Sequence, residues 1–142
     1  SSENFIALNG DVFVTQPMVP VVDYHFERKN VFTMVAMRTE KVDGEVQNKG
    51  GLEIGEGDAL LSFRGHEQIN EKWVNGGFYV VNRKKILSWP SERYDLEKTL
   101  ASLLKPDRAM IFRSEGRLLD IGTPECLELA QKNYETYSIP SG

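Results

Sequence analysis

Residues 5–11 read FIALNGD, and the fold that we predict for the chain follows from this stretch. Its first four residues are apolar, which is typical of a β-strand buried on both faces of a sheet. Asn9 and Gly10 then favour a turn, and Asp11 follows directly. Ligands of open α/β sheets collect at the carboxyl ends of the strands, so Asp11 is a candidate site residue.

A second stretch, LLDIGTPE at residues 118–125, repeats the pattern of an apolar run that leads into a carboxylate. Asp120 is that carboxylate, and Thr123 before Pro124 is a favourable start for a helix. Mg²⁺ is typically held by one or two carboxylates, with water and phosphate in its other positions. Asp11 and Asp120 together therefore predict a magnesium–phosphate site, although each alone is also consistent with a turn or a helix cap.

The segment after the first turn predicts a helix and a second strand. Two prolines suit the first turn of a helix that ends near Asn30. The expected inner face of this helix consists of Val21, Val22 and Phe26. Residues 31–37 are rich in apolar and β-branched side chains and predict the next strand. Strand, helix and strand in this order predict a βαβ crossover and a parallel pair of strands.

Further strands are predicted in the second half of the chain. Residues 51–54 and 59–63 flank a turn that contains two glycines, and they predict a hairpin. Residues 73–81 predict a strong strand that contains an Asn-Gly-Gly triplet at residues 75–77. Adjacent glycines mark either a β-bulge or a place where a ligand approaches the backbone, and the pattern leaves both interpretations open.

Size and composition describe an ordinary globular protein. The chain of 142 residues suits one domain, residues 1–142, and its net charge of −4 gives no electrostatic basis for binding nucleic acid. No apolar run approaches the length of a membrane span, and we expect no signal peptide. The single cysteine, Cys126, fits a reducing cytoplasm and is expected to be a packed thiol. Glu97 falls in the first turn of a predicted helix, where the helix dipole alone explains a carboxylate.

Four segments in register resemble the sugar-1-phosphate nucleotidylyltransferases, the pyrophosphorylases that make nucleotide sugars. The segments are LNGD at residues 8–11, VNGGFYV at 74–80, YDLEK at 94–98 and DIGTPE at 120–125. They are most similar to the bacterial branch that activates heptose-1-phosphate with a guanylyl group or glucose-1-phosphate with a cytidylyl group. The resemblance covers nearly the whole chain.

This resemblance implies a fold, a reaction and a set of residues. The implied fold is α/β, a Rossmann-like (GT-A-like) mixed sheet flanked by helices. The implied reaction joins a nucleoside triphosphate to a sugar-1-phosphate and releases pyrophosphate, with Mg²⁺ as the cofactor. By resemblance, Asp11 and Asp120 would be catalytic metal ligands. The residues placed against the sugar would be Asn75, Gly76, Gly77 and Glu97.

The sequence also departs from that family. The family opens with a glycine-rich loop carrying an arginine, followed by a Pro-Lys pair, and this loop wraps the nucleotide phosphates. No such segment occurs here, so the chain is expected to be the C-terminal portion of a longer enzyme that lacks the N-terminal nucleotide-binding strands. Residues 62–66 also lack the lysine that the family often carries before the sugar-binding strand. We therefore expect negligible pyrophosphorylase activity from this chain alone.

A sheet without its first strands has an exposed edge, which proteins normally cover. We expect self-association or pairing with a missing N-terminal half through that edge. Two other interpretations stay open at this point: a non-catalytic module that binds sugar phosphate or regulates an enzyme, and a structural remnant that binds nothing. A glycosyltransferase is disfavoured, because no Asp-X-Asp motif stands at a strand end.

Overall fold

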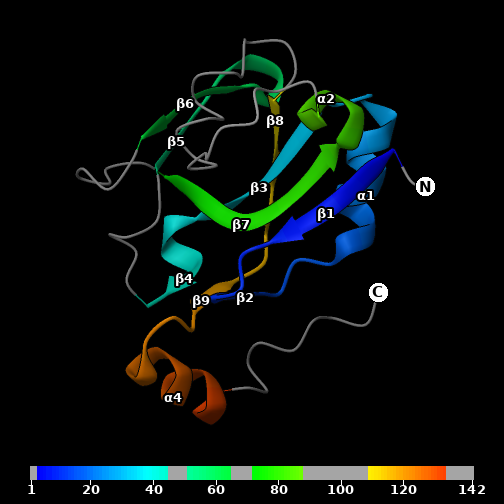
Figure 1. The fold of residues 1–142 in the computed structure, drawn as a ribbon. Coiled ribbons are helices and arrows are strands. Elements are labelled where there is room, and N and C mark those ends of the chain that lie inside the picture. The colour runs from blue at the N-terminus through cyan, green and yellow to red at the C-terminus, as the bar shows by residue number, and fades with distance from the viewer. Residues whose placement is uncertain (1–2, 45–50, 65–71, 88–108, 134–142) are drawn as a thin grey trace.

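The computed structural model describes residues 3–44, 51–64, 72–87 and 109–133 (Figure 1). These residues form a mixed α/β fold with a larger and a smaller sheet. The larger sheet contains β1 (Asn4–Leu8), β3 (Phe32–Arg38), β5 (Gly51–Ile54), β6 (Leu60–Arg64), β7 (Trp73–Asn82) and β8 (Ala109–Arg113). The smaller sheet contains β2 (Val12–Val14), β4 (Val42–Asp43) and β9 (Leu118–Asp120). The helices are α1 (Met18–Glu27), α2 (Arg83–Leu87) and α4 (Pro124–Lys132).

The central strand of the larger sheet is β7. Strand order is β6-β5-β7-β3-β8, and β1 pairs with β7 off this path. Strand β7 is antiparallel to β1, β3 and β5, whereas β3 and β8 are parallel. It is buried from Trp73 to Val81, which fits its many aromatic and β-branched residues. The predicted strands and the hairpin of β5 and β6 are therefore present.

The expected parallel pair of the first two predicted strands does not form. Strand β7 lies between β1 and β3 and is antiparallel to both. As a result β1 and β3 run in the same direction across the sheet but do not touch. The prediction was wrong because it paired strands that are neighbours in sequence, whereas β7 packs both of its faces and takes the central place.

Two apolar cores lie on the two faces of the larger sheet. Successive side chains of a strand point to opposite faces, so Met34 and Ala36 enter one core and Val35 and Met37 enter the other. Helix α1 covers the second core and contributes Val21, which is fully buried. Within the described residues, no helix is long and apolar enough to cross a membrane.

Strand β1 is present as predicted, but the expectation that it is buried on both faces is wrong. Phe5 and Ile6 are each 40% exposed and Leu8 is 59% exposed. The cause is the position of β1, because it pairs with β7 along one edge and no other strand of the described residues lies along its outer edge. An apolar strand with interior character thus stands at the border of the described sheet.

The helix after β2 begins and ends close to the predicted positions, but its inner face differs. Val21 and His25, one turn apart, are buried, whereas Phe26 is 55% exposed instead of facing the core. His25 Nε2 bonds to Asn4 Oδ1 (3.1 Å) and His25 Nδ1 to Thr33 Oγ1 (2.9 Å). Because an amide oxygen can only accept, the proton sits on Nε2, and Nδ1 accepts from the Thr33 hydroxyl. This polar network ties α1 to β1 and β3.

The buried histidine predicts a loss of stability in mild acid. Burial lowers the pKa of His25 below its ordinary value of 6.5. The unfolded chain therefore takes up the proton at a higher pH than the folded chain, and the free energy of unfolding decreases as the pH falls through that window. Urea unfolding at pH 7 and pH 5 measures the change, and this range stays above the ordinary carboxyl pKa of about 4. The loss should be smaller in a His25→Gln variant; an equal loss in both proteins would contradict the assignment.

The smaller sheet joins the two predicted carboxylate motifs. Strand β2 is antiparallel to β9, and β4 is parallel to β9. Helix α4 follows β9, and its start confirms the predicted cap, because Cys126 N donates to Thr123 Oγ1 (3.2 Å). Cys126 is buried, as expected of a packed thiol. In Figure 1, β2 and β9 lie below the larger sheet, with α4 beneath them.

Candidate functional site

Pairing of β2 with β9 brings Asp11 and Asp120 together. The ladder places Val12 opposite Asp120, and it continues beyond β2 because Ile121 N donates to Asp11 O (2.9 Å). Asp11 follows the carboxyl end of β1, and Asp120 is the last residue of β9. Two positions more than a hundred residues apart in sequence are thus neighbours at the junction of the two sheets. The expected proximity of the two aspartates is present in the structure.

Gly122 leaves space beside both carboxylates, because it has no side chain to crowd them. A Cβ added to Gly122 would lie 3.1 Å from Asp120 Oδ1 and 3.7 Å from Asp11 Oδ2. Asp120 is buried, and its Oδ1 accepts a hydrogen bond from Gly122 N (2.9 Å), which fixes the carboxylate in a turn. Asp11 is exposed. One carboxylate is therefore held by the fold, while the other is accessible from solvent.

This donor set fits a divalent cation of the magnesium type. Mg²⁺ prefers oxygen ligands and keeps several waters or phosphate oxygens, so one or two carboxylates suffice for the protein's share. The two aspartates supply oxygen ligands close to the space at Gly122. Among the described residues there is no group of three or more histidine, cysteine or acidic side chains that could hold a metal. An ion at this place would thus need phosphate or water to complete its shell.

The open space at Gly122 gives a first test of the ion site. We expect Gly122→Ala to weaken Mn²⁺ or Mg²⁺ binding about tenfold, a change of about 1.4 kcal/mol, because the methyl group would crowd both carboxylates. Gly122 does not have a positive φ, so the fold should tolerate alanine. Calorimetric titration measures the affinity. Gly10→Ala is the control, because nothing lies within 4 Å of its added Cβ. Unchanged ion binding by Gly122→Ala would contradict the site.

The glycine pair of β7 forms a bulge beside the Asp11 turn. On β3, a single residue separates the partners of Asn75 and Tyr79, so β7 carries extra residues opposite β3. Gly77 has a φ of +67° and its carbonyl accepts from Asn9 N (2.8 Å). A Cβ on Gly77 would lie 2.9 Å from Asn9 Nδ2. The β-bulge, one of the two interpretations that the sequence left open, is thus present. It supports Asn9, which lies two residues before Asp11.

The other two residues of the triplet are engaged within the sheet. Asn75 Nδ2 donates to Tyr79 Oη (2.7 Å), and Asn75 Oδ1 accepts from Gly77 N (2.9 Å). The Cβ that Gly76 lacks would lie 2.8 Å from Val35 O, so this glycine permits close pairing with β3. A contact of Asn75 or Gly76 with sugar stays a prediction. Glu97, the last predicted sugar-binding residue, lies outside the described residues.

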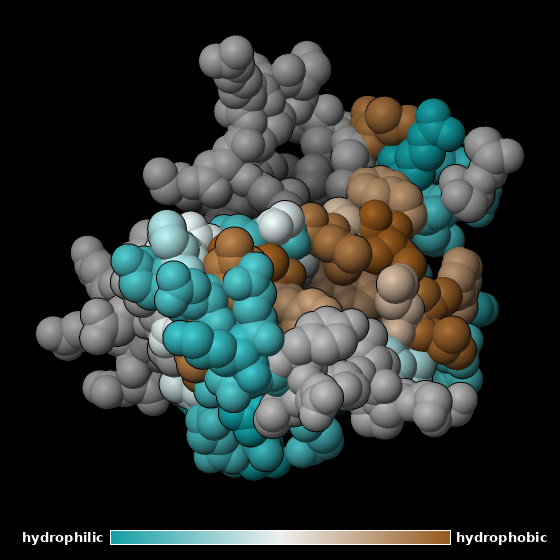
Figure 2. All heavy atoms as spheres, turned by 90° about the horizontal axis from the view of Figure 1, so that it is seen from below, coloured by the Kyte–Doolittle hydropathy of each residue, from teal (hydrophilic) through white to brown (hydrophobic). Residues whose placement is uncertain are grey.

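An apolar groove lies next to the bulge and the aspartate turn. It has a volume of about 780 Å³. Its lining is mostly apolar and comes from the end of β1, from β2, from the start of α1 and from β7: Leu8, Asn9, Val12, Phe13, Val14, Gln16, Pro17, Met18, Val19, Pro20, Gly77 and Phe78. Figure 2 looks at the molecule from below and shows apolar surface gathered on this side. The groove could not be predicted from the sequence, because its wall is made by residues of four separate elements.

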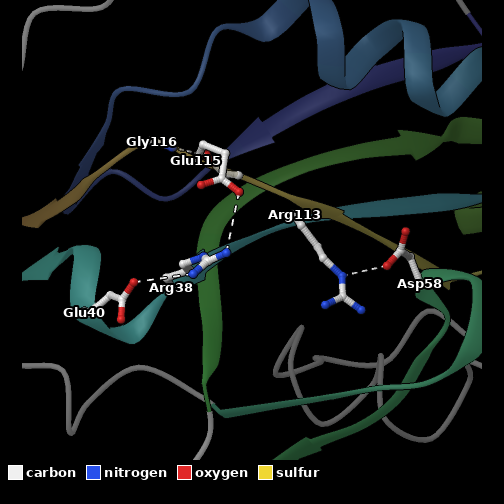
Figure 3. A network of polar contacts seen from close by, with 7 residues as sticks. Arg38, Glu40, Asp58, Arg113, Glu115 and Gly116 are labelled. Carbon is white, nitrogen blue, oxygen red and sulfur yellow. Dashed lines mark hydrogen bonds and ion pairs between the residues drawn. The ribbon is translucent and has the colours of Figure 1, made fainter.

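A second polar cluster lies at the carboxyl ends of β3 and β8, which is the same end of the larger sheet as the carboxyl end of β1, and Figure 3 shows it. Arg113 Nε bonds to Asp58 Oδ1 (2.7 Å), and the Arg38 guanidinium lies 3.5 Å from Glu40 and 3.8 Å from Glu115. Both guanidinium groups also approach the Trp73 ring, at 5.3 and 5.4 Å from its centre. Three carboxylates face two cations here, so the cluster does not favour an anionic ligand. We assign it to holding β3, β7 and β8 together, at the modest strength of exposed ion pairs.

The fold matches part of solved nucleotidylyltransferase structures. The chain matches solved structures of HddC from Yersinia pseudotuberculosis, at a TM-score of 0.77 and 20% sequence identity, and of HddC complexed with GMP-PN, at 0.77 and 18%. Each match covers 94% of this chain and 56% of HddC. A Bacillus anthracis protein assigned as a glucose-1-phosphate thymidylyltransferase, solved with sucrose, matches at a TM-score of 0.76 and 16% identity, over 99% of this chain and 57% of that one.

The similarity between this chain and these solved structures is a similarity of fold. No protein-family model matches the chain, and no curated protein matches its sequence. The chain spans a little over half the length of the structures that it matches. The resemblance inferred from the four sequence segments is confirmed by these structures, since they are the kind of enzyme that the segments indicated.

Proposed function

We propose that the chain is the sugar-phosphate-binding portion of a Mg²⁺-dependent sugar-1-phosphate nucleotidylyltransferase. The observation that carries this proposal is the meeting of Asp11 and Asp120 around the space at Gly122, in a fold that matches nucleotidylyltransferases. On this proposal the larger sheet is the acceptor part of a Rossmann-like (GT-A-like) domain. The whole enzyme would convert a nucleoside triphosphate and a sugar-1-phosphate into a nucleotide sugar and pyrophosphate.

In this reaction an oxygen of the sugar phosphate attacks the α-phosphorus of the triphosphate, and the bond to the β-phosphate breaks so that pyrophosphate leaves. A bound Mg²⁺ supplies neutralising charge to the phosphate oxygens. Asp120 is held by its bond from Gly122 N, and it would present a fixed oxygen to the ion. Asp11 is exposed, and it would complete the pair from the solvent side. The bulge at Gly77 would hold Asn9, and with it the Asp11 turn, against the groove.

Titration of the chain with glucose-1-phosphate, in the presence and absence of Mg²⁺, tests the proposal. We expect binding that requires the ion, together with negligible pyrophosphate release when a triphosphate is added. Two carboxylates near a sugar phosphate and a triphosphate need more positive charge than one ion provides. Absence of any Mg²⁺-dependent binding, with heptose-1-phosphate as well as glucose-1-phosphate, would overturn the proposal. Robust pyrophosphate release by this chain alone would show that the acceptor portion suffices, contrary to our expectation.

A further inference from the structure

Gly44, the residue that follows β4, lies directly against the side chain of Asp120. Its φ of +112° is a backbone conformation that glycine adopts far more readily than other residues. A Cβ added to Gly44 would lie 2.7 Å from Asp120 Cβ and 3.4 Å from Cys126 Sγ. The absence of a side chain at position 44 therefore lets the backbone of the β4 segment pack against one of the two candidate metal ligands.

Pairing of β4 with β9 brings Gly44 to this place. The two strands are parallel, with Asp43 opposite Leu119, so the next step of the same register places Gly44 beside Asp120. An ion pair reinforces the pairing, because Arg117 Nη2 donates to Asp43 Oδ2 (2.8 Å). Arg117 directly precedes β9, and the ion pair thus ties the two strands together close to Asp120.

Asp120 is restrained from several directions. Val12 of β2 pairs with it along one side of β9, and Gly44 packs against its Cβ from the β4 side. Its Oδ1 accepts the hydrogen bond from Gly122 N (2.9 Å), and only 8% of the residue is exposed. The carboxylate therefore has little room to shift toward or away from an ion.

Mg²⁺ and Ca²⁺ respond differently to a carboxylate that cannot move. Mg²⁺ requires nearly ideal octahedral geometry with oxygen ligands at about 2.0–2.1 Å, whereas Ca²⁺ takes roughly six to eight oxygens at about 2.3–2.6 Å in flexible arrangements. A carboxylate fixed in advance favours the small ion with strict geometry. A carboxylate that can shift serves the larger ion equally well. Rigidity at Asp120 is thus a means of selecting between the two ions.

We propose that Gly44 and the Asp43–Arg117 ion pair position the Asp120 carboxylate, and that this makes the ion site selective for Mg²⁺ over Ca²⁺. These are positioning residues, because they act on the ion through Asp120. The inference rests on the proposed function, since it concerns the ion that Asp11 and Asp120 would hold. It adds a role for β4, which none of the four sequence segments includes.

Calorimetric titration of the whole chain with Mg²⁺ and with Ca²⁺ tests the ion pair through Asp43→Asn. We expect Mg²⁺ affinity to fall about tenfold, as is usual when a group that orients a metal ligand is lost, while Ca²⁺ affinity falls much less. The matched control is Asp58→Asn, which removes the ion pair with Arg113. The Asp58 side chain is 30% exposed and that of Asp43 is 29% exposed, so the two substitutions change charge in similar surroundings. A loss of charge alone would weaken both ions equally, and the ratio of the two affinities is therefore the readout.

Gly44→Ala tests the contact with Asp120 itself. The added methyl group would press on Asp120 Cβ, so Mg²⁺ affinity should fall at least about tenfold. The control is Gly57→Ala, because Gly57 also has a positive φ, of +66°, but nothing lies within 4 Å of its added Cβ. Far-UV circular dichroism and the melting temperature show whether each variant is folded. Asp43→Asn adds no bulk, and it decides the question if Gly44→Ala does not fold.

The proposal is overturned if Asp43→Asn keeps the wild-type ratio of Mg²⁺ to Ca²⁺ affinity, or if Asp58→Asn lowers that ratio as much. It is also overturned if the wild-type chain binds the two ions equally well. In each of these cases the chain still binds Mg²⁺, so the proposed function stands. A wild-type chain that binds neither ion would refute the ion site of the proposed function, and the role of Gly44 with it.

Discussion

Replacing Asp120 with asparagine should lower the Mg²⁺-dependent affinity for sugar-1-phosphate by about 100-fold, because the ion would lose one of the two carboxylates that the chain offers. The fold should not suffer. Asparagine keeps a side-chain oxygen that can accept the hydrogen bond from Gly122 N, which Asp120 Oδ1 accepts at 2.9 Å. Calorimetric titration with glucose-1-phosphate at saturating Mg²⁺ measures the affinity, and thermal unfolding checks the stability.

The matched control is Asp23→Asn, which makes the same change of charge on the exposed side of α1. If Asp11 and Asp120 hold the ion, the Asp23→Asn control should keep the wild-type affinity for sugar-1-phosphate. Equal weakening by the two substitutions would mean that the net charge of the chain, and not a local site, governs binding. Wild-type affinity in the Asp120→Asn protein would contradict the site directly.

The place of each aspartate at the end of a strand could be predicted from the sequence because it depends on local pattern. An apolar run followed by a turn residue places a carboxylate at a strand end, and this held for both Asp11 and Asp120. The Thr123 cap, the helix that begins at Pro124 and the glycine bulge of β7 follow from equally local rules. Each of these features is set by residues within a few positions of one another.

The features that sequence reasoning missed depend on partners far along the chain. Nothing in residues 5–8 shows that β7 will lie between β1 and β3, because strand order is set by long-range pairing. The inner face of α1 turned toward His25 because its ring finds Thr33 and Asn4, which come from two other strands. Gly122 was passed over for the same reason, since its role is visible only once Asp11 lies beside it.

The exposure of β1 is the most informative of these differences. Its composition predicts a buried strand, and the structure places it at the border of the described sheet with Leu8 59% exposed. The local sequence pattern indicates the environment that a strand suits. The solvent exposure of its side chains shows what surrounds the strand in this structure. The disagreement between the two shows that the composition of a strand does not fix its place in the sheet.

Replacing Gly76 with alanine should lower the free energy of unfolding by about 3 kcal/mol, the upper end of what overpacking a core usually costs. The added Cβ would lie 2.8 Å from Val35 O and 3.0 Å from Met37 Cγ, and both residues are fully buried in β3. A backbone carbonyl at the centre of a sheet cannot move without disturbing its ladder. The gain from a less flexible unfolded chain, about 0.4–1 kcal/mol, is too small to offset this clash.

Urea unfolding at pH 7 measures the change, with Gly10→Ala as the control of identical chemistry. Nothing lies within 4 Å of a Cβ at Gly10, so its stability should stay within about 0.5 kcal/mol of the wild-type value. Equal effects at the two positions would mean that the close pairing of β7 with β3 is not what requires Gly76. If the large difference is found, the close pairing of β7 with β3 is a sufficient structural reason for glycine at position 76.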